Sequence, residues 1–228
     1  MHSFIASKIY EKPYEDYIIA KDVENPDIDQ MILIKERQIA KAAGFAINYG
    51  GNGHTISKNL GITPKEGDRV YDAYFAAFPG LRNYFDKVIA ETLKNGFIHV
   101  NDVSKRRLNL IDYKRMVNYE RRPDKRTEYN KLKSKIGRLA LNVPIQGTAA
   151  DITKTAAIKF RNWVYSAKVD DSVWITNIIH DEINVECLED KADLVANKLE
   201  ELMAEAGDIW CKTVPLHAKA VISTHWVH

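Results

Sequence analysis

The sequence has little cysteine: Cys187 and Cys211 are its only two, and neither belongs to a CxxC pair. This excludes a disulfide framework and a zinc motif, and it predicts reduced thiols in a cytosol-like compartment. No apolar run approaches the ~20 residues that a membrane span requires. The N-terminus also lacks the basic start and apolar stretch of a secretory signal. We therefore expect a cytoplasmic protein that has no membrane partner.

Net charge is also small, at +2, but it is distributed unevenly. Residues 105–138 hold thirteen Lys or Arg and only four acidic residues, a local net charge of +9, which leaves −7 for the rest of the chain. Such a local excess favours contact with a polyanion such as nucleic acid. A solvated, partly mobile charged loop is the alternative interpretation.

The pattern of apolar residues predicts a mostly helical chain with a small, antiparallel sheet, which is the α+β class. Helices are expected over residues 29–49, a short stretch up to 60, from 63 to about 77, 81–94, 127–141, 148–167 and 191–206. Strands are expected over 97–100, over 173–187 as a hairpin and over 216–222. Pro144 is expected to interrupt the helical run between 127 and 167.

Four residues of the first long helix recur at every fourth position: Arg37, Lys41, Phe45 and Tyr49. Each step of four residues rotates only about 40° around a helix axis, so all four fall on one stripe. Two cations followed by two aromatic rings suit a nucleoside triphosphate, because the cations meet phosphates and the rings meet base and sugar. The alternative is an amphipathic helix with two surface cations and two core aromatics.

The expected hairpin has a polar turn, His180-Asp181-Glu182, between apolar strands. Carboxylates held rigidly at such a turn can coordinate Mg²⁺, and a pair of such ions supports phosphoryl transfer. An ordinary polar β-turn is the alternative. A third candidate surface comprises Asn142 and Gln146, whose amides could contact base edges on either side of the break at Pro144. There the alternative is a plain helix–proline–helix joint.

Three segments, in this order and spacing, resemble family A DNA polymerases. RQIAKAAGFAINYG is similar to the fingers motif R-x3-K-x3-F-x3-Y-G, LNVPIQGTAADI to the segment leading into the palm helices, and IIHDEINVE to the palm turn. The stretches FPGLRNYF and SKRRLNL agree as well. The resemblance extends over nearly the whole chain and implies an incomplete polymerase right-hand fold, with fingers at 1–100 and part of the palm at 101–228.

The resemblance also implies roles for individual residues. Arg37, Lys41 and His2 would bind the triphosphate of the incoming deoxynucleotide (dNTP), with Lys41 a candidate proton donor to the departing pyrophosphate. Phe45 would lie against the sugar, and Tyr49 would stack at the templating position. Asp181 would be the catalytic metal ligand, and Glu182 would support it from the periphery. The residues expected to contact primer–template DNA are Arg106, Arg107, Arg138, Asn142, Gln146 and His180.

One family feature has no counterpart in this sequence: the first palm carboxylate, in a motif like D-Y-S-x-I-E-x-R. The thumb and any proofreading exonuclease, which precede the palm in the family, are missing too. Both Mg²⁺ ions of the two-metal site could then be held only if a second polypeptide, or a missing segment, supplied the other carboxylate. We therefore predict a DNA-directed DNA polymerase subunit or fragment that is inactive alone, as a split polymerase of a phage or its bacterial host would be.

Two other functions remain open. A single-subunit RNA polymerase fragment shares the fold, but Phe45 and Glu182 differ from the residues expected there. A non-catalytic nucleic-acid-binding or scaffold module with a polymerase-like shape is the alternative from another class. Loss of Mg²⁺-dependent primer extension in an Asp181→Ala variant would distinguish the enzyme from such a module.

Overall fold

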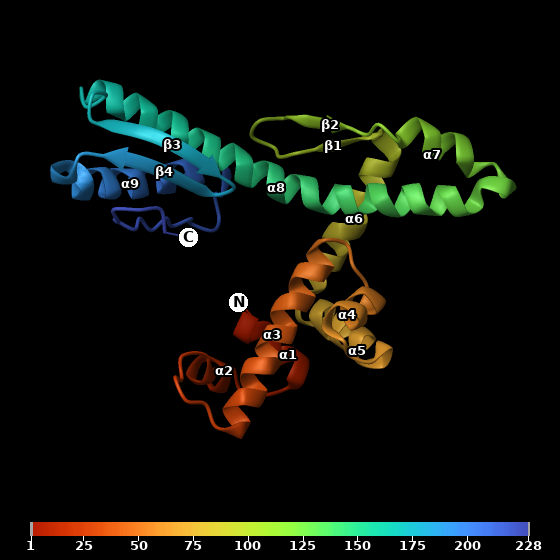
Figure 1. Ribbon diagram of the computed structural model, residues 1–228. Coiled ribbons are helices and arrows are strands. Elements are labelled where there is room, and N and C mark those ends of the chain that lie inside the picture. Colours follow the sequence, from red (N-terminus) through yellow and green to blue (C-terminus); the bar gives the residue numbers. More distant parts are fainter. Residues whose placement is uncertain (1, 228) are drawn as a thin grey trace. The chain divides into compact units, whose positions relative to one another are not determined.

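The computed structural model describes residues 2–227, and these form a mostly helical chain with two small two-stranded sheets (Figure 1). The predicted α+β class is confirmed. The first six helices are α1 (His2–Tyr10), α2 (Tyr14–Lys21), α3 (Ile28–Asn48), α4 (Gly53–Leu60), α5 (Pro64–Ala77) and α6 (Pro79–Asn95). The strands β1 (Phe97–His99) and β2 (Arg107–Asn109) follow, and then α7 (Tyr113–Glu120), α8 (Arg126–Ser166), the strands β3 (Val173–Ile179) and β4 (Glu182–Cys187), and α9 (Ala192–Trp210).

The described chain divides into two compact units. The first comprises residues 2–98 and 109–142, and the second comprises 99–108 and 143–227. The long helix α8 contributes its first part to one unit and its last part to the other.

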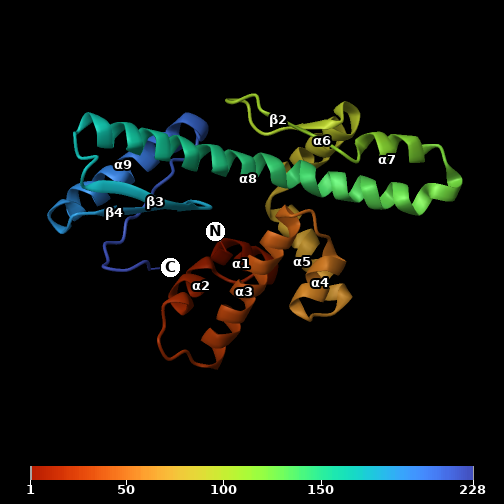
Figure 2. The same cartoon turned by 45° about the horizontal axis from the view of Figure 1, so that its top comes forward.

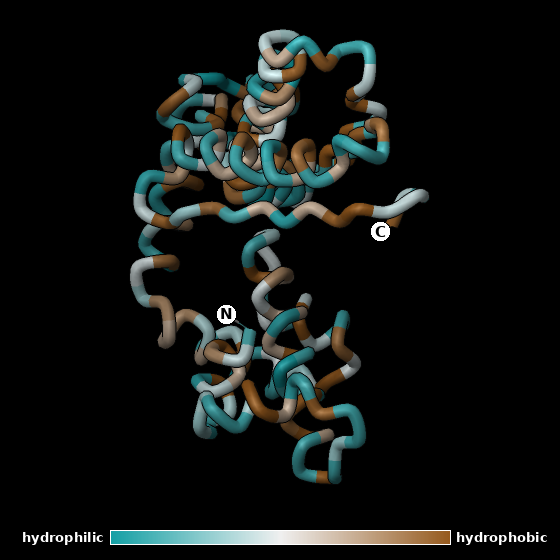
Figure 3. Tube along the Cα trace, turned by 90° about the vertical axis from the view of Figure 1, so that its left-hand side faces the viewer, coloured by the Kyte–Doolittle hydropathy of each residue, from teal (hydrophilic) through white to brown (hydrophobic). Residues whose placement is uncertain are grey.

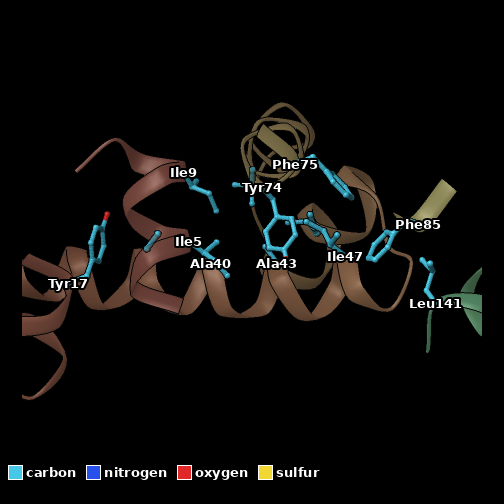
Figure 4. Close-up of a cluster of buried hydrophobic side chains, with 13 residues drawn as sticks. Ile5, Ile9, Tyr17, Ala40, Ala43, Ile47, Tyr74, Phe75, Phe85 and Leu141 are labelled. Atoms are coloured by element: carbon cyan, nitrogen blue, oxygen red, sulfur yellow. The ribbon is translucent and has the colours of Figure 1, made fainter. Parts of the chain in front are cut away.

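The core of the first unit lies where α1 and α5 pack against one face of α3 (Figure 4). On that face α3 presents small residues, Ala40 and Ala43, followed by Ile47. Small side chains let neighbouring helices approach closely, so the larger Ile5 of α1 and Tyr74 of α5 fill the space. Asp27 begins α3 with a capping box, in which its carboxylate accepts from the backbone N–H of Gln30. The helix that carries the predicted nucleotide stripe is thus capped at one end and anchored along its buried side.

The core of the second unit lies between the β3–β4 hairpin and two helices, α9 and the C-terminal part of α8. Figures 1 and 2 show the hairpin beside both helices. Phe160 of α8 is fully buried here, with Val173 of β3, Ile183 of β4 and Leu199 of α9 around it. This packing covers one face of the hairpin and fixes the turn between its strands.

The expected helix break at Pro144 is wrong, since α8 runs without interruption from Arg126 to Ser166. Proline removes one backbone donor and crowds the preceding turn, at a cost of about 3 kcal/mol. Buried residues occur on both sides of it, with Ile136 and Ala140 before and Ala156 and Phe160 after. Their packing offsets the local penalty. Asn142 and Gln146 consequently lie on one continuous helix, one turn apart.

The expected strand over residues 216–222 is also wrong, because this part of the chain is extended but pairs with neither strand of the second unit. Its contacts go to α9 instead. Leu216 lies against Gly207, and the backbone N–H of Ala220 donates to Glu200 Oε1 at 2.6 Å. In Figure 3 the segment that ends at the C label appears as an extended tube.

Candidate functional site

The predicted stripe on α3 lies on the exposed side of the helix. Phe45 is 51% exposed and Tyr49 is 47% exposed, whereas Ala40, Ala43 and Ile47 are buried. Phe45 and Tyr49 are therefore not core aromatics, and their contact with a nucleotide stays a prediction. Two half-exposed rings following two cations along a helix make a surface that can receive a ligand with both an aromatic and an anionic part.

His2 of α1 lies beside this stripe, and its predicted contact with a triphosphate stays a prediction. Its ring lies 6.0 Å from the ring of Phe45, centroid to centroid. Ser3, the next residue, accepts a hydrogen bond from Arg37 Nε at 3.2 Å and so orients the guanidinium. The Nδ1 atom of His2 is buried without a hydrogen-bond partner among the described residues. Burial, and after it the positive charge of Arg37, lowers the pKa of His2. These residues form a cationic site at one end of the stripe.

The lowered pKa of His2 predicts proton uptake when a triphosphate binds. Phosphate charges would offset those of Arg37 and Lys41, which raises the pKa of His2 back toward or above its ordinary 6.5. A dNTP should therefore bind more tightly as the pH falls through the window between the lowered pKa and 6.5. The stability of the unliganded chain should have the opposite pH dependence. Its unfolded state binds this proton better than its folded state, so the free energy of unfolding should fall as the pH drops through the same window.

Calorimetric titration of the chain with dATP, in two buffers of different ionisation enthalpy, measures this uptake. The terminal phosphate of the nucleotide also titrates in this range, so the comparison is with a His2→Asn variant. Less proton uptake by the variant is the expected result. Equal uptake by both proteins would show that His2 does not sense the phosphates.

Arg138 lies beside the glycine that follows the stripe. Gly50 has φ of +75°, and a Cβ built there would lie 2.9 Å from Arg138 Cγ, so both the backbone conformation and the space require glycine. The Arg138 guanidinium donates to Ser134 Oγ at 2.7 Å. Gly50 and Arg138 also line a hollow of about 380 Å³ in the first unit.

Sequence analysis missed the rest of this hollow. Arg82 lies 4.5 Å from the ring centre of Phe75 and 5.6 Å from that of Tyr71. Lys133 adds a further cation to the lining. A guanidinium stacked on aromatic rings is held flat and pre-organised. Arg82 and Phe75 come from different helices, so no local sequence pattern could have paired them.

The carboxylate turn of the second unit is a two-residue connection. Ile179 pairs with Glu182, which leaves His180 and Asp181 at the tip. His180 has φ of +52°, a left-handed conformation in which histidine, asparagine and aspartate are more common than other non-glycine residues. Two-residue hairpin connections require such a positive φ. Both His180 and Asp181 are exposed.

Glu182 begins β4 next to Asp181, and its Oε1 accepts a hydrogen bond from the indole N–H of Trp226 at 2.8 Å. No group of three or more His, Cys, Asp or Glu able to hold a metal occurs within residues 2–227. Mg²⁺ is commonly bound through one or two carboxylates together with water and substrate phosphates. The exposed carboxylate of Asp181 fits one ligand position of such a shared site, and its role as a metal ligand stays a prediction.

The side chain of Arg106 forms hydrogen bonds within the second unit. Its Nη2 donates to Asp151 Oδ1 at 2.8 Å and to the carbonyl of Gly147 at 3.2 Å. The other oxygen of Asp151 accepts from Asn101 Nδ2 at 2.9 Å. Arg106 thus fastens the loop between β1 and β2 to α8, while its neighbour Arg107 is exposed.

Gly147 of α8 lies against this loop, and Gly147→Ala should destabilise the chain. A Cβ there would lie 2.4 Å from Val100 Cγ1. The overlap should cost about 1–3 kcal/mol, more than the roughly 1 kcal/mol that alanine gains in a helix interior. Thermal unfolding measures the effect. Gly80→Ala is the matched control, because Gly80 in α6 has open space around it, and that variant should be neutral or more stable. A Gly147→Ala variant as stable as Gly80→Ala would contradict the packing argument.

The remaining predicted DNA contacts lie on α8. The side-chain amide of Asn142 donates to the carbonyl of Arg138 at 3.0 Å, which leaves its oxygen available, and Gln146 is exposed. Their roles in DNA contact stay predictions, as do those of Arg107 and His180.

Comparisons with known proteins bear on the family and the fold of the chain. The model of DNA polymerase family A matches residues 17–228. DNA polymerase I of Pseudomonas aeruginosa is 28% identical over 226 residues, which cover 99% of this chain and 21% of that protein. DNA polymerase I of Streptococcus pneumoniae is 32% identical over 206 residues, which cover 90% of this chain and 21% of that protein. The chain therefore spans about a fifth of the length of these relatives.

A solved structure is similar as well: the POL domain of Pol1 from M. smegmatis, in complex with DNA primer–template and dNTP. The two share 26% sequence identity with a TM-score of 0.68, over 90% of this chain and 31% of that one. No helix within the described residues is long and apolar enough to cross a membrane.

Proposed function

Since this chain belongs to DNA polymerase family A, we propose that it takes part in DNA-directed transfer of a nucleotide from a dNTP to a primer 3′ end. The cluster of His2, Arg37, Lys41 and Phe45 carries the proposal. These residues were predicted to meet the incoming nucleotide. Three of them are linked by contacts within the first unit: His2 by its ring contact with Phe45, and Arg37 through Ser3 beside His2.

Each residue has a task that its chemistry permits. Arg37 and Lys41 neutralise the triphosphate, and Lys41 is placed to give a proton to the pyrophosphate as it departs. Phe45 packs on the sugar. Asp181 would hold Mg²⁺ together with the substrate phosphates, and the bound ion would supply charge stabilisation for phosphoryl transfer. Glu182 supports this site from its edge.

The chain needs a second palm carboxylate, and we propose that another polypeptide or another segment supplies it. Two observations support this. No metal-binding group of three ligands lies within residues 2–227. The β3–β4 sheet, moreover, has only these two strands there, so both edges are open to a further strand. The same polypeptide would bring the thumb. A cytoplasmic location, in a bacterial or phage-infected cell, remains a prediction.

Primer extension by complementation tests the function. The complementing polypeptide is the DNA polymerase I of Streptococcus pneumoniae from which the segment matching this chain has been removed. The two are mixed, and also joined in one polypeptide, with a primed template, dNTPs and Mg²⁺. Extension by the combination and by neither part alone is expected. A folded combination that binds primed template but never extends it would favour a non-catalytic DNA-binding module.

A further inference from the structure

The segment that follows α9 returns along the second unit to the carboxylate turn. It is fastened to α9 at two places, by Leu216 against Gly207 and by the backbone N–H of Ala220 donating to Glu200 Oε1. Farther along, Trp226 reaches Glu182. A Cβ on Gly207 would lie 2.8 Å from Leu216 Cβ, so the first attachment is a close one. We call residues 211–227 the C-terminal strap.

Trp226 is a large aromatic residue on the surface of the C-terminal strap. Its side chain is 59% exposed, so burial of the ring explains little of its presence. Its indole N–H instead donates to Glu182 Oε1 at 2.8 Å. An indole is a donor without an acceptor and carries no charge. It can hold a carboxylate oxygen without neutralising the carboxylate.

We propose that Trp226 is a positioning residue that sets the orientation of Glu182 beside Asp181. With Oε1 held by the indole, the rotation of the carboxylate beside Asp181 is restrained. This inference rests on the proposed function, in which Glu182 supports the metal site. Groups that orient metal-site carboxylates in this way commonly contribute 10- to 100-fold to metal affinity or activity.

The contact itself is tested in the chain alone, without any assumption about function. Limited digestion with trypsin reports how firmly the strap is held, through cleavage after Lys212 and Lys219. Trp226→Phe and Glu182→Ala should speed this cleavage. Glu182→Gln should not, because its amide oxygen still accepts the bond, and Trp174→Phe on β3 is the matched tryptophan control. Equal cleavage rates of Trp226→Phe and the unaltered chain would show that the hydrogen bond between Trp226 and Glu182 does not hold the strap in place.

The positioning role is tested in the complemented polymerase. Trp226→Phe should lower kcat about tenfold and raise the Mg²⁺ concentration needed for half-maximal rate, with KM for dNTP unchanged. Trp226→His, which keeps a ring N–H, should recover part of the rate. A kcat and Mg²⁺ requirement equal to those of the unaltered complex would overturn the positioning role alone. An unaltered complex that never extends a primer would overturn the proposed function and this role with it, while the digestion result for the strap would stand.

Discussion

Replacing Asp181 with alanine should abolish primer extension by the complemented polymerase, with a fall in kcat of about 10³-fold or more. A metal at a phosphoryl-transfer site contributes several kcal/mol of charge stabilisation, and each 1.36 kcal/mol is a tenfold change in rate. Asp181 is exposed at the tip of the hairpin, so its removal should leave the fold intact. Single-turnover extension of a labelled primer measures the loss.

Two controls separate chemistry from binding in this experiment. Asp170→Ala removes a carboxylate from another exposed surface of the same unit and should leave the rate unchanged. Binding of primed template to the Asp181→Ala complex should also be retained. If the variant extended primers at a rate near that of the unaltered complex, the assignment of Asp181 as a metal ligand would be wrong.

Sequence patterns predicted those parts of the chain whose structure is decided locally. The helix expected over residues 29–49 is α3, Ile28–Asn48, and its ends lie at the capping box of Asp27 and just before Gly50. Alternating apolar residues on each side of His180-Asp181 were sufficient to predict the β3–β4 hairpin. In both cases the determining contacts lie within a few residues of one another in the sequence.

The errors occurred where distant contacts outweigh local preference. Proline at 144 favours a helix end, but packed residues on either side of it keep α8 continuous. Residues 216–222 have the alternation of a strand, yet their contacts go to α9, through Gly207 and Glu200. The contact of Trp226 with Glu182 was not predicted for the same reason, because the two residues are 44 positions apart in the sequence. No single-sequence pattern contains these pairings.

Lys41→Ala should slow the chemical step of the complemented polymerase about 100-fold or more, with a smaller effect on dNTP affinity. Lys41 lies one helical turn from Arg37 and one from Phe45, so its ammonium and the guanidinium lie along the same side of the helix. Arg37 is oriented by Ser3, whereas Lys41 is exposed and free to follow the departing pyrophosphate. A residue that acts on the leaving group stabilises the transition state more than the ground state, and its loss therefore lowers kcat.

The comparison of Lys41→Ala with Lys35→Ala decides whether this effect is specific. Lys35 is an exposed cation of the same helix, but it lies two residues from Arg37 and so points about 160° away from it around the axis. General electrostatic attraction of nucleotide to α3 would make both variants similarly slow, and more so at low salt. If Lys41 donates the proton, only Lys41→Ala should be slow. Its loss of rate should then be smaller with a nucleotide whose leaving group needs no proton. Equal rates for the two variants would remove Lys41 from the chemistry and leave α3 with a role in attraction alone.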